Sequence, residues 1–152
     1  MELDSNLVKE KIETYREDKN CAQSTLMGLC DVAGLPTEEL ATLATGFGGG
    51  IGGTFDEGTC GAVTGAVMAL GFLGADGEQI SSCAKGLFNA FKEEYGSVTW
   101  IIGGIDGWTY SEFKEEYGSV TCGAISKNGE DKSPCVEVCV FAGEKVCELL
   151  KE

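Results

Sequence analysis

The residues of this 152-residue chain that are best suited to chemistry are its eight cysteines. A thiolate is a nucleophile, a metal ligand and a redox group, and its surroundings decide which of these roles it takes. In a reducing compartment, cysteines in such numbers are more often catalytic, metal-binding or redox-sensing than paired in structural disulfides. The eight are Cys21, Cys30, Cys60, Cys83, Cys122, Cys135, Cys139 and Cys147.

Two absences from the sequence narrow this chemistry. The chain contains no histidine, which excludes Ser-His and Cys-His catalysis, histidine-ligated zinc and haem attachment through C-x-x-C-H. It also contains no C-x-x-C pair, so the thioredoxin and zinc-ribbon patterns are missing. Thiol chemistry and metal binding by thiolates alone are left.

Cys60 lies in a stretch rich in glycine, GFGGGIGGTFDEGTCGAVTGAVMALGFLG. Residues 46–58 predict a tight loop, because each glycine in a helix interior costs about 1 kcal/mol relative to alanine. Residues 58–75 carry no charge and predict a buried helix with Cys60 in its first turn. The free N–H groups and the dipole at a helix start favour a thiolate there. The alternative is that Cys60 is only a small buried apolar side chain.

Cys21 is also predicted at a helix start. Asn20 and Gln23 have the spacing of a capping box, in which each side chain bonds the backbone N–H of the other residue. This pattern places Cys21 in the first turn of a helix, where a thiolate is again favoured.

The last predicted helix begins at Ser133-Pro134, with serine at the cap and proline at the first helical position. Cys135 and Cys139 lie one turn apart on it and can share a site. Cys147 lies farther round this helix. Cys30 and Cys83 fall in apolar stripes of other predicted helices, which favours a packing role.

Helical periodicity dominates the chain and sets the expected fold class. It predicts an all-α single domain over residues 1–152, a bundle of about six helices around the central Gly/Ala-rich helix. Residues 58–71 are expected to be the most buried, and Ser5 is the expected cap of the first helix. The other predicted helices cover residues 5–15, 21–30, 37–45, 78–95 and 133–149.

Charge and hydropathy exclude several partners. The formal net charge of −14, from 25 acidic and 11 basic residues, argues against nucleic acid and anionic membrane as partners. The uncharged run at residues 58–75 is shorter than the roughly 20 residues that span a bilayer, so we expect no membrane span. The acidic start, Met1-Glu-Leu-Asp, does not fit a signal peptide. We therefore expect a cytoplasmic protein.

A nine-residue sequence, FKEEYGSVT, occurs at residues 91–99 and again at 113–121. Two copies are too few for a solenoid, so residues 92–113 are interpreted as a local duplicated insert. Between the copies, WIIGGIDGW predicts a short β-hairpin. Its apolar side chains either cover the insert, which the frequency of scattered surface apolar residues favours, or contact a partner. The second alternative predicts a homodimer through residues 100–112, because apolar hairpin edges tend to find partners.

Several motifs together resemble one known family. They are Asn20-Cys21-Ala22-Gln23, the glycine run from Gly46, Cys60-Gly61-Ala62-Val63-Thr64-Gly65, Cys122 and Cys135. This arrangement resembles the C_GCAxxG_C_C family of small, helical, redox-active bacterial and archaeal proteins. The resemblance covers nearly the whole chain except the duplicated insert, which directly precedes Cys122.

The resemblance implies which cysteines form the site. By match, the four that carry the family pattern are Cys21, Cys60, Cys122 and Cys135, and Cys139 fits less well. We expect these four to converge in space. The cysteines expected to lie apart from them are Cys30, Cys83 and Cys147.

Three functions fit these residues. The preferred hypothesis is thiol redox chemistry with an unknown redox partner, in which Cys60 or Cys21 attacks and a neighbouring cysteine resolves the product as a disulfide. The second is a zinc or iron–sulfur site with four thiolate ligands, the same four cysteines. The third is a helical scaffold without chemistry, whose cysteines are core residues and whose tryptophan-containing insert mediates association.

Overall fold

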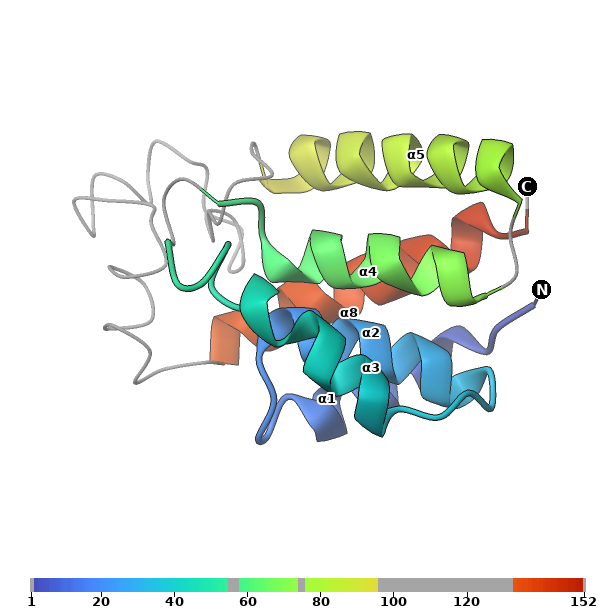
Figure 1. The fold of residues 1–152 in the computed structure, drawn as a ribbon. Coiled ribbons are helices and arrows are strands. Elements are labelled where there is room, and N and C mark those ends of the chain that lie inside the picture. The colour runs from blue at the N-terminus through green and yellow to red at the C-terminus, as the bar shows by residue number, and fades with distance from the viewer. Residues whose placement is uncertain (1, 55–57, 74–75, 96–132, 152) are drawn as a thin grey trace.

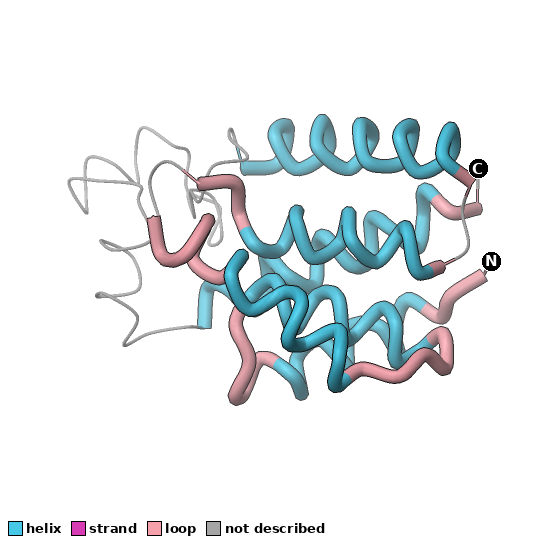
Figure 2. Tube along the Cα trace, in the orientation of Figure 1, coloured by secondary structure: helices cyan, strands magenta, loops and turns pink. Residues whose placement is uncertain are grey.

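The computed structural model describes residues 2–54, 58–73, 76–95 and 133–151, and the structural statements below concern these residues. They form six α-helices and one short 3-10 helix and contain no strand. This confirms the predicted all-α bundle (Figures 1 and 2). The elements are α1 (Ser5–Tyr15), α2 (Cys21–Val32), α3 (Glu38–Ala44), η1 (Thr45–Phe47), α4 (Gly61–Phe72), α5 (Gly77–Tyr95) and α8 (Ser133–Leu149).

Several predictions fall outside the described residues. Most of the duplicated insert, the predicted hairpin and Cys122 lie in residues 96–132, so the structure does not test them. The homodimer through residues 100–112 and the single-domain organisation stay predictions.

The directions of the helices place three helix starts together. Figure 1 shows α2, α4 and α8 running in one direction, whereas α1 and α5 run in the opposite direction. The helices α2, α4 and α8 also pack against one another. Their N-terminal ends therefore lie at the same end of the bundle, on the left of Figure 1.

The most buried helix is α2 rather than the glycine-rich segment. Nine of its twelve residues are buried, against nine of the fourteen residues 58–71. The prediction that residues 58–71 would be the most buried is therefore wrong. The reason is that α2 packs against four helices, α1, α3, α4 and α8, whereas Gly71 near the end of α4 is exposed.

Side-chain caps fix the starts of α1 and α2. The cap of α1 is Asp4 and not Ser5, since the Asp4 carboxylate accepts hydrogen bonds from the backbone N–H groups of Asn6 (2.9 Å) and Leu7 (3.2 Å). A carboxylate at this position also suits the helix dipole. The capping box predicted for α2 is present: Asn20 accepts from the Gln23 N–H, and Gln23 accepts from the Asn20 N–H.

The close approach of α2 and α4 depends on glycine. A Cβ atom at Gly65 would overlap the carbonyl oxygen of Ala22 and would lie 3.1 Å from its carbonyl carbon and Cα. At Gly61 a Cβ would overlap the Sγ of Cys21. The absence of side chains at these two positions thus lets the start of α2 lie directly against α4.

Candidate thiol site

Three cysteines lie at the N-terminal ends of α2, α4 and α8, at the same end of the bundle. Cys21 is the first residue of α2, Cys60 is the N-cap of α4, and Cys135 is the third residue of α8. Cys60 thus precedes the first turn in which it was predicted, since the helix begins at Gly61. Cys139 lies one turn deeper in α8, and all four are buried. We call these four residues the thiol cluster.

At Cys21, α2 contacts both α4 and α8 directly. The Sγ of Cys139 donates to the carbonyl oxygen of Cys21 over 3.7 Å. The hydroxyl of Thr25 donates to the same carbonyl oxygen over 2.9 Å. On the other side, the Sγ of Cys21 occupies the space left by the missing side chain of Gly61. Cys21 is therefore held between α4 and α8.

Electrostatic coupling links all four cysteines. Burial raises the pKa of Cys60 well above its ordinary value, and the charges of Cys21, Cys139 and Cys135 raise it further. Burial likewise raises the pKa of Cys139, with a further contribution from Cys21. Because like charges disfavour one another at short range, ionising one thiol of the cluster hinders ionisation of the next. The cluster therefore behaves as one coupled group.

The raised pKa values overturn one expectation from the sequence. A helix start was expected to lower the pKa of Cys60, but loss of hydration on burial has the larger effect and raises it. The nearby N–H of Ala62 opposes this only in part. Cys60 is thus a protonated thiol at neutral pH, which makes it less reactive than the thiolate predicted there.

Cys21 has the best support for a negative charge within the cluster. Burial raises its pKa, but the backbone N–H of Gly49, the charge of Arg16 and the N–H of Ala22 all lower it. Gly49 has a positive φ of 63°, a conformation that suits glycine. The glycine loop predicted from the sequence thus brings an N–H donor to the Cys21 thiol.

Hydrogen bonds hold the chain near this loop against the start of α2. The Asn20 side chain donates to the Thr45 carbonyl over 3.1 Å, and Gln23 donates to the Ala41 carbonyl over 2.9 Å. Gly48 lies against the Asn20 side chain, where a Cβ atom would meet Asn20 Cβ at 2.9 Å. The capping residues of α2 therefore also position the glycine loop beside Cys21.

An aromatic group from α5 and α8 lies close to the cluster. Phe91 and Tyr95 pack with ring centroids 4.8 Å apart, and Tyr95 meets Phe141 edge-on at 5.3 Å. Burial raises the pKa of Tyr95, and the charges of Cys60 and Cys139 contribute to the rise. Phe91 and Tyr95 are both buried, so these rings form part of the core between α5 and α8.

The remaining described cysteines have other surroundings. Burial alone raises the pKa of Cys30 to about 11, and burial is the largest of the causes that raise the pKa of Cys147 to about 11. Neither shift involves another cysteine. Both residues are therefore understood as core side chains.

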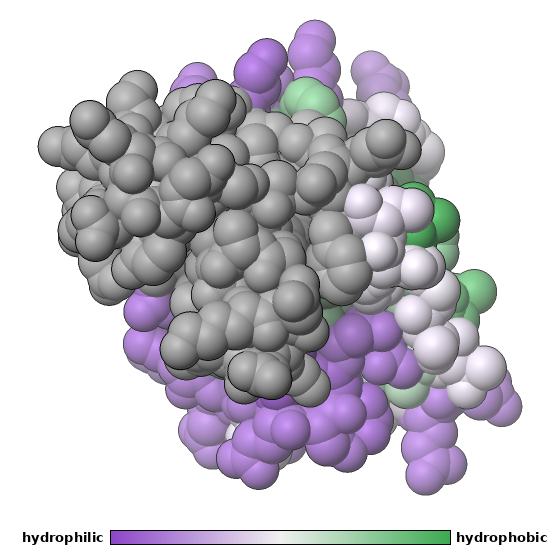
Figure 3. All heavy atoms as spheres, turned by 90° about the vertical axis from the view of Figure 1, so that its left-hand side faces the viewer, coloured by the Kyte–Doolittle hydropathy of each residue, from purple (hydrophilic) through white to green (hydrophobic). Residues whose placement is uncertain are grey.

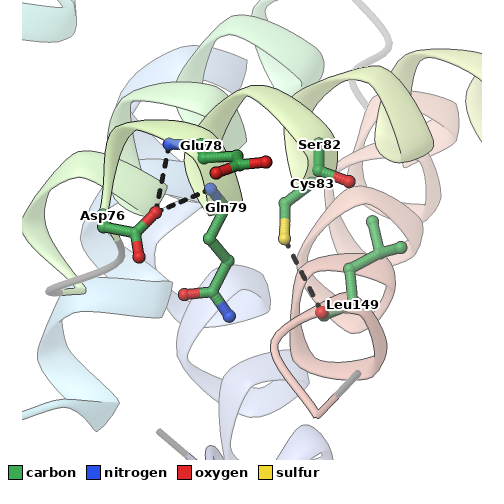
Figure 4. A pocket seen from close by; sticks show the side chains of 6 residues that line it. All are labelled: Asp76, Glu78, Gln79, Ser82, Cys83 and Leu149. Atoms are coloured by element: carbon green, nitrogen blue, oxygen red, sulfur yellow. Dashed lines mark hydrogen bonds between the residues drawn. The ribbon is translucent and has the colours of Figure 1, made fainter.

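Cys83 lies beside the open hollow shown in Figure 4, which has a volume of about 410 Å³. Its Sγ donates to the carbonyl oxygen of Leu149 over 3.6 Å. Asp76 in the same hollow accepts from the N–H groups of Glu78 and Gln79 and so caps α5. The polar groups here complete the ends of α5 and α8, at the opposite end of the bundle from the thiol cluster (Figure 1).

The end of the bundle that holds the cluster faces the viewer in Figure 3, with hydrophilic described residues along its lower edge.

Between the seven described cysteines the structure has no disulfide. In the same part of the chain, no three cysteine, aspartate or glutamate side chains are grouped so that they could hold a metal ion. The four-thiolate alternative also needs Cys122, which lies outside the described residues.

Two groups at the site had little or no signal in the sequence. Cys139 belongs to the cluster, and its spacing from Cys135 had indicated only that the two could share a site. Arg16 influences the cluster from the end of α1. A single arginine after a helix gives no pattern that distinguishes a buried side chain from a solvated one.

Comparison with known families supports the assignment made from the motifs. The family model described as "Putative redox-active protein (C_GCAxxG_C_C)" matches residues 19–99, which is more than half of the chain. The protein belongs to the C_GCAxxG_C_C family. The matched segment contains Cys21, the glycine loop and Cys60. No curated protein and no solved structure matched the chain.

None of the described helices has the length and apolar character needed to cross a membrane.

Proposed function

We propose that this protein carries out thiol–disulfide exchange at the thiol cluster, with Cys21 as the attacking thiol and Cys60 as the resolving thiol. The observation that carries the proposal is the convergence of Cys21, Cys60 and Cys135 from three helix starts, together with Cys139. The redox role in the family description is consistent with it. Cys122, which belongs to the family pattern, is proposed as a further member of the site.

The exchange has two steps. The Cys21 thiolate attacks one sulfur of a substrate disulfide, which forms a mixed disulfide and releases the other substrate sulfur as a thiolate. Cys60 then loses its proton and attacks the Cys21 sulfur, forming the Cys21–Cys60 disulfide and releasing the second substrate thiolate. Two protein thiols are oxidised, one disulfide is reduced to two thiols, and two protons pass from the protein thiols to the products.

The choice of these two cysteines follows from their surroundings. Cys21 has N–H donors and a positive charge that support its thiolate. The Cys21 Sγ lies against Gly61, the residue that follows Cys60, and among the charges that affect the pKa of Cys60, that of Cys21 has the largest effect. A resolving thiol need not be acidic when it attacks an adjacent mixed disulfide, because proximity replaces much of the intrinsic reactivity.

Disulfide mapping tests the proposal. The reduced protein is treated with a small excess of oxidised glutathione, the remaining thiols are counted, and the linked peptides are identified by mass spectrometry. We expect the loss of two thiols and a Cys21–Cys60 linkage. Cys21→Ser and Cys60→Ser should abolish the linkage, whereas Cys30→Ser, which changes a buried cysteine of the same helix as Cys21, should retain it.

Two results would overturn this function. One is a linkage pattern that excludes the thiol cluster, or no loss of thiols under conditions in which a dithiol peptide, treated in parallel as a control, forms its disulfide. The other is zinc or iron at about one atom per chain in anaerobically purified protein, together with protection of the cluster from oxidation, which would favour thiolate metal binding.

A further inference from the structure

Arg16 is a buried charge that has no carboxylate partner in the part of the chain that the structure describes. It follows the last residue of α1, and only 6% of its surface is exposed. Its Nη1 donates to the carbonyl oxygen of Lys19 over 2.5 Å, but its buried Nε has no hydrogen-bond partner in residues 2–54, 58–73, 76–95 and 133–151. Among the described residues it forms no ion pair. A buried guanidinium in this state costs free energy unless a negative charge lies nearby.

The Lys19 carbonyl that accepts from Arg16 lies two residues before Cys21, so the guanidinium lies at the start of α2, beside the thiol cluster. The charge of Arg16 acts on two residues of the thiol cluster, Cys21 in α2 and Cys139 in α8, and lowers the pKa of each. The nearby Asp18 pairs instead with Lys19 at the surface. Arg16 is thus a fixed positive charge that favours the thiolate form of two residues of the thiol cluster.

Of these two thiols, Cys21 is the better partner. Cys139 donates its proton to the Cys21 carbonyl and lies inside α8, one turn from Cys135. The backbone N–H of Gly49 in the glycine loop also lowers the pKa of Cys21. A charge on Cys21 is therefore supported from two sides, by a backbone donor and by a guanidinium.

We propose that Arg16 is the counter-charge of the Cys21 thiolate and thereby selects Cys21 as the attacking thiol of the cluster. Arg16 acts through Cys21, so it is a positioning residue. The inference rests on the proposed function, because it assigns the charge that this function needs. It explains why a protein with a formal net charge of −14 buries an arginine beside its cysteines.

The test uses two alkylating reagents of similar size, neutral iodoacetamide and anionic iodoacetate. Reduced full-length protein is alkylated at neutral pH in the presence of a chelator, and the rate at each cysteine is followed by peptide mass spectrometry. Arg16→Gln removes the charge, Arg16→Lys keeps it, and Lys19→Gln removes a neighbouring surface charge as a control. All variants are compared by circular dichroism and by their urea midpoints.

In the wild type we expect the ratio of the iodoacetate rate to the iodoacetamide rate to be higher at Cys21 than at Cys30, whose pKa is influenced by no charged group. Because this is a ratio at each site, it does not depend on how often the site opens to solvent. Arg16→Gln should slow alkylation of Cys21 by about tenfold, as expected for loss of an opposite charge at short range. It should also reduce the ratio at Cys21 to that at Cys30. Arg16→Lys should restore most of both effects, and Lys19→Gln should change neither.

Equal ratios at Cys21 and Cys30 in the wild type would overturn the inference, and so would an unchanged Cys21 rate in folded Arg16→Gln. If Arg16→Gln does not fold, the wild-type ratio and Arg16→Lys still decide. These failures are distinct from failure of the proposed function. A Cys21–Cys60 disulfide formed by the wild type would uphold thiol exchange without a role for Arg16. A charge-dependent ratio without any cluster disulfide would uphold the ion pair but not the exchange.

Discussion

Replacing Gly65 with alanine should destabilise the protein, whereas the same change at Gly71 in the same helix should stabilise it. A Cβ atom at Gly65 would overlap the Ala22 carbonyl oxygen and approach two further backbone atoms of Ala22 to 3.1 Å. Backbone atoms of a packed helix cannot rotate away as a side chain can, so α2 and α4 would have to separate. At Gly71 the Cβ would meet nothing within 4 Å.

The magnitude follows from two opposing contributions. Both substitutions gain about 1 kcal/mol of helix propensity, because glycine is the less favourable residue in a helix interior. Gly65→Ala also incurs an overpacking cost of about 1–3 kcal/mol, toward the upper end because backbone is involved. We expect Gly71→Ala to raise the free energy of unfolding by about 0.5–1 kcal/mol and Gly65→Ala to lower it by about 1–2 kcal/mol.

Urea denaturation at neutral pH under reducing conditions measures both values, provided that the slope m is unchanged between variants. The difference between the two variants is the informative quantity, since it removes the contribution of helix propensity that they share. Equal stabilisation by both changes would show that α2 and α4 are not in backbone contact at Gly65, and the placement of Cys21 against α4 would lose its support.

Three further outcomes follow from the same structure. Gly61→Ala should displace the Cys21 sulfur, because a Cβ atom at position 61 would overlap it. Peptide mapping should therefore show slower disulfide formation at Cys21, and an unchanged rate would contradict this placement of the sulfur. Asn20→Ala should lower the urea-derived stability by about 1 kcal/mol through loss of the capping box, and an unchanged midpoint would refute the capping role. The pKa of Cys30 and of Cys147 is raised from 9.0 to about 11, so above pH 9 the unfolded chain loses these protons while the folded protein keeps them. Their contribution to stability is complete below pH 9 and is lost as the pH rises toward 11, by about 1–2 kcal/mol for each after an allowance for solvent screening. Urea titrations across this range should show a smaller loss in Cys30→Ala, and an equal loss would contradict the assignment.

Local patterns in the sequence predicted the local structure well. The capping box at Asn20 and Gln23 is present, because both partners lie within one helical turn and need no tertiary support. Helical periodicity gave the all-α class for the same reason. Even the error at the first helix is small, since Asp4 and Ser5 are both good caps and the carboxylate has the additional advantage of charge.

Properties that depend on packing could not be predicted in this way. The sequence indicated that Cys60 stands at a helix start, but not how completely the surrounding helices would remove water from it. The pKa therefore moves in the direction opposite to the one expected. Cys139 and Arg16 join the site because α8 and the end of α1 pack against the start of α2, which is information that no local motif contains.

The opposition between burial and charge explains how one thiol can be distinguished among four. If the helix starts alone governed reactivity, Cys21, Cys60 and Cys135 would be similar, since each lies at the N-terminal end of a helix. Burial raises the pKa of Cys21, Cys60 and Cys139 alike, so differences arise from the few groups that oppose it. The pKa of Cys21 is lowered by the N–H groups of Gly49 and Ala22 and by the charge of Arg16. That of Cys139 is lowered by Arg16 and Thr25, and that of Cys60 only by the N–H of Ala62. If Cys21 is the attacking thiol, as proposed, reactivity is concentrated where the glycine loop and Arg16 both oppose the effect of burial.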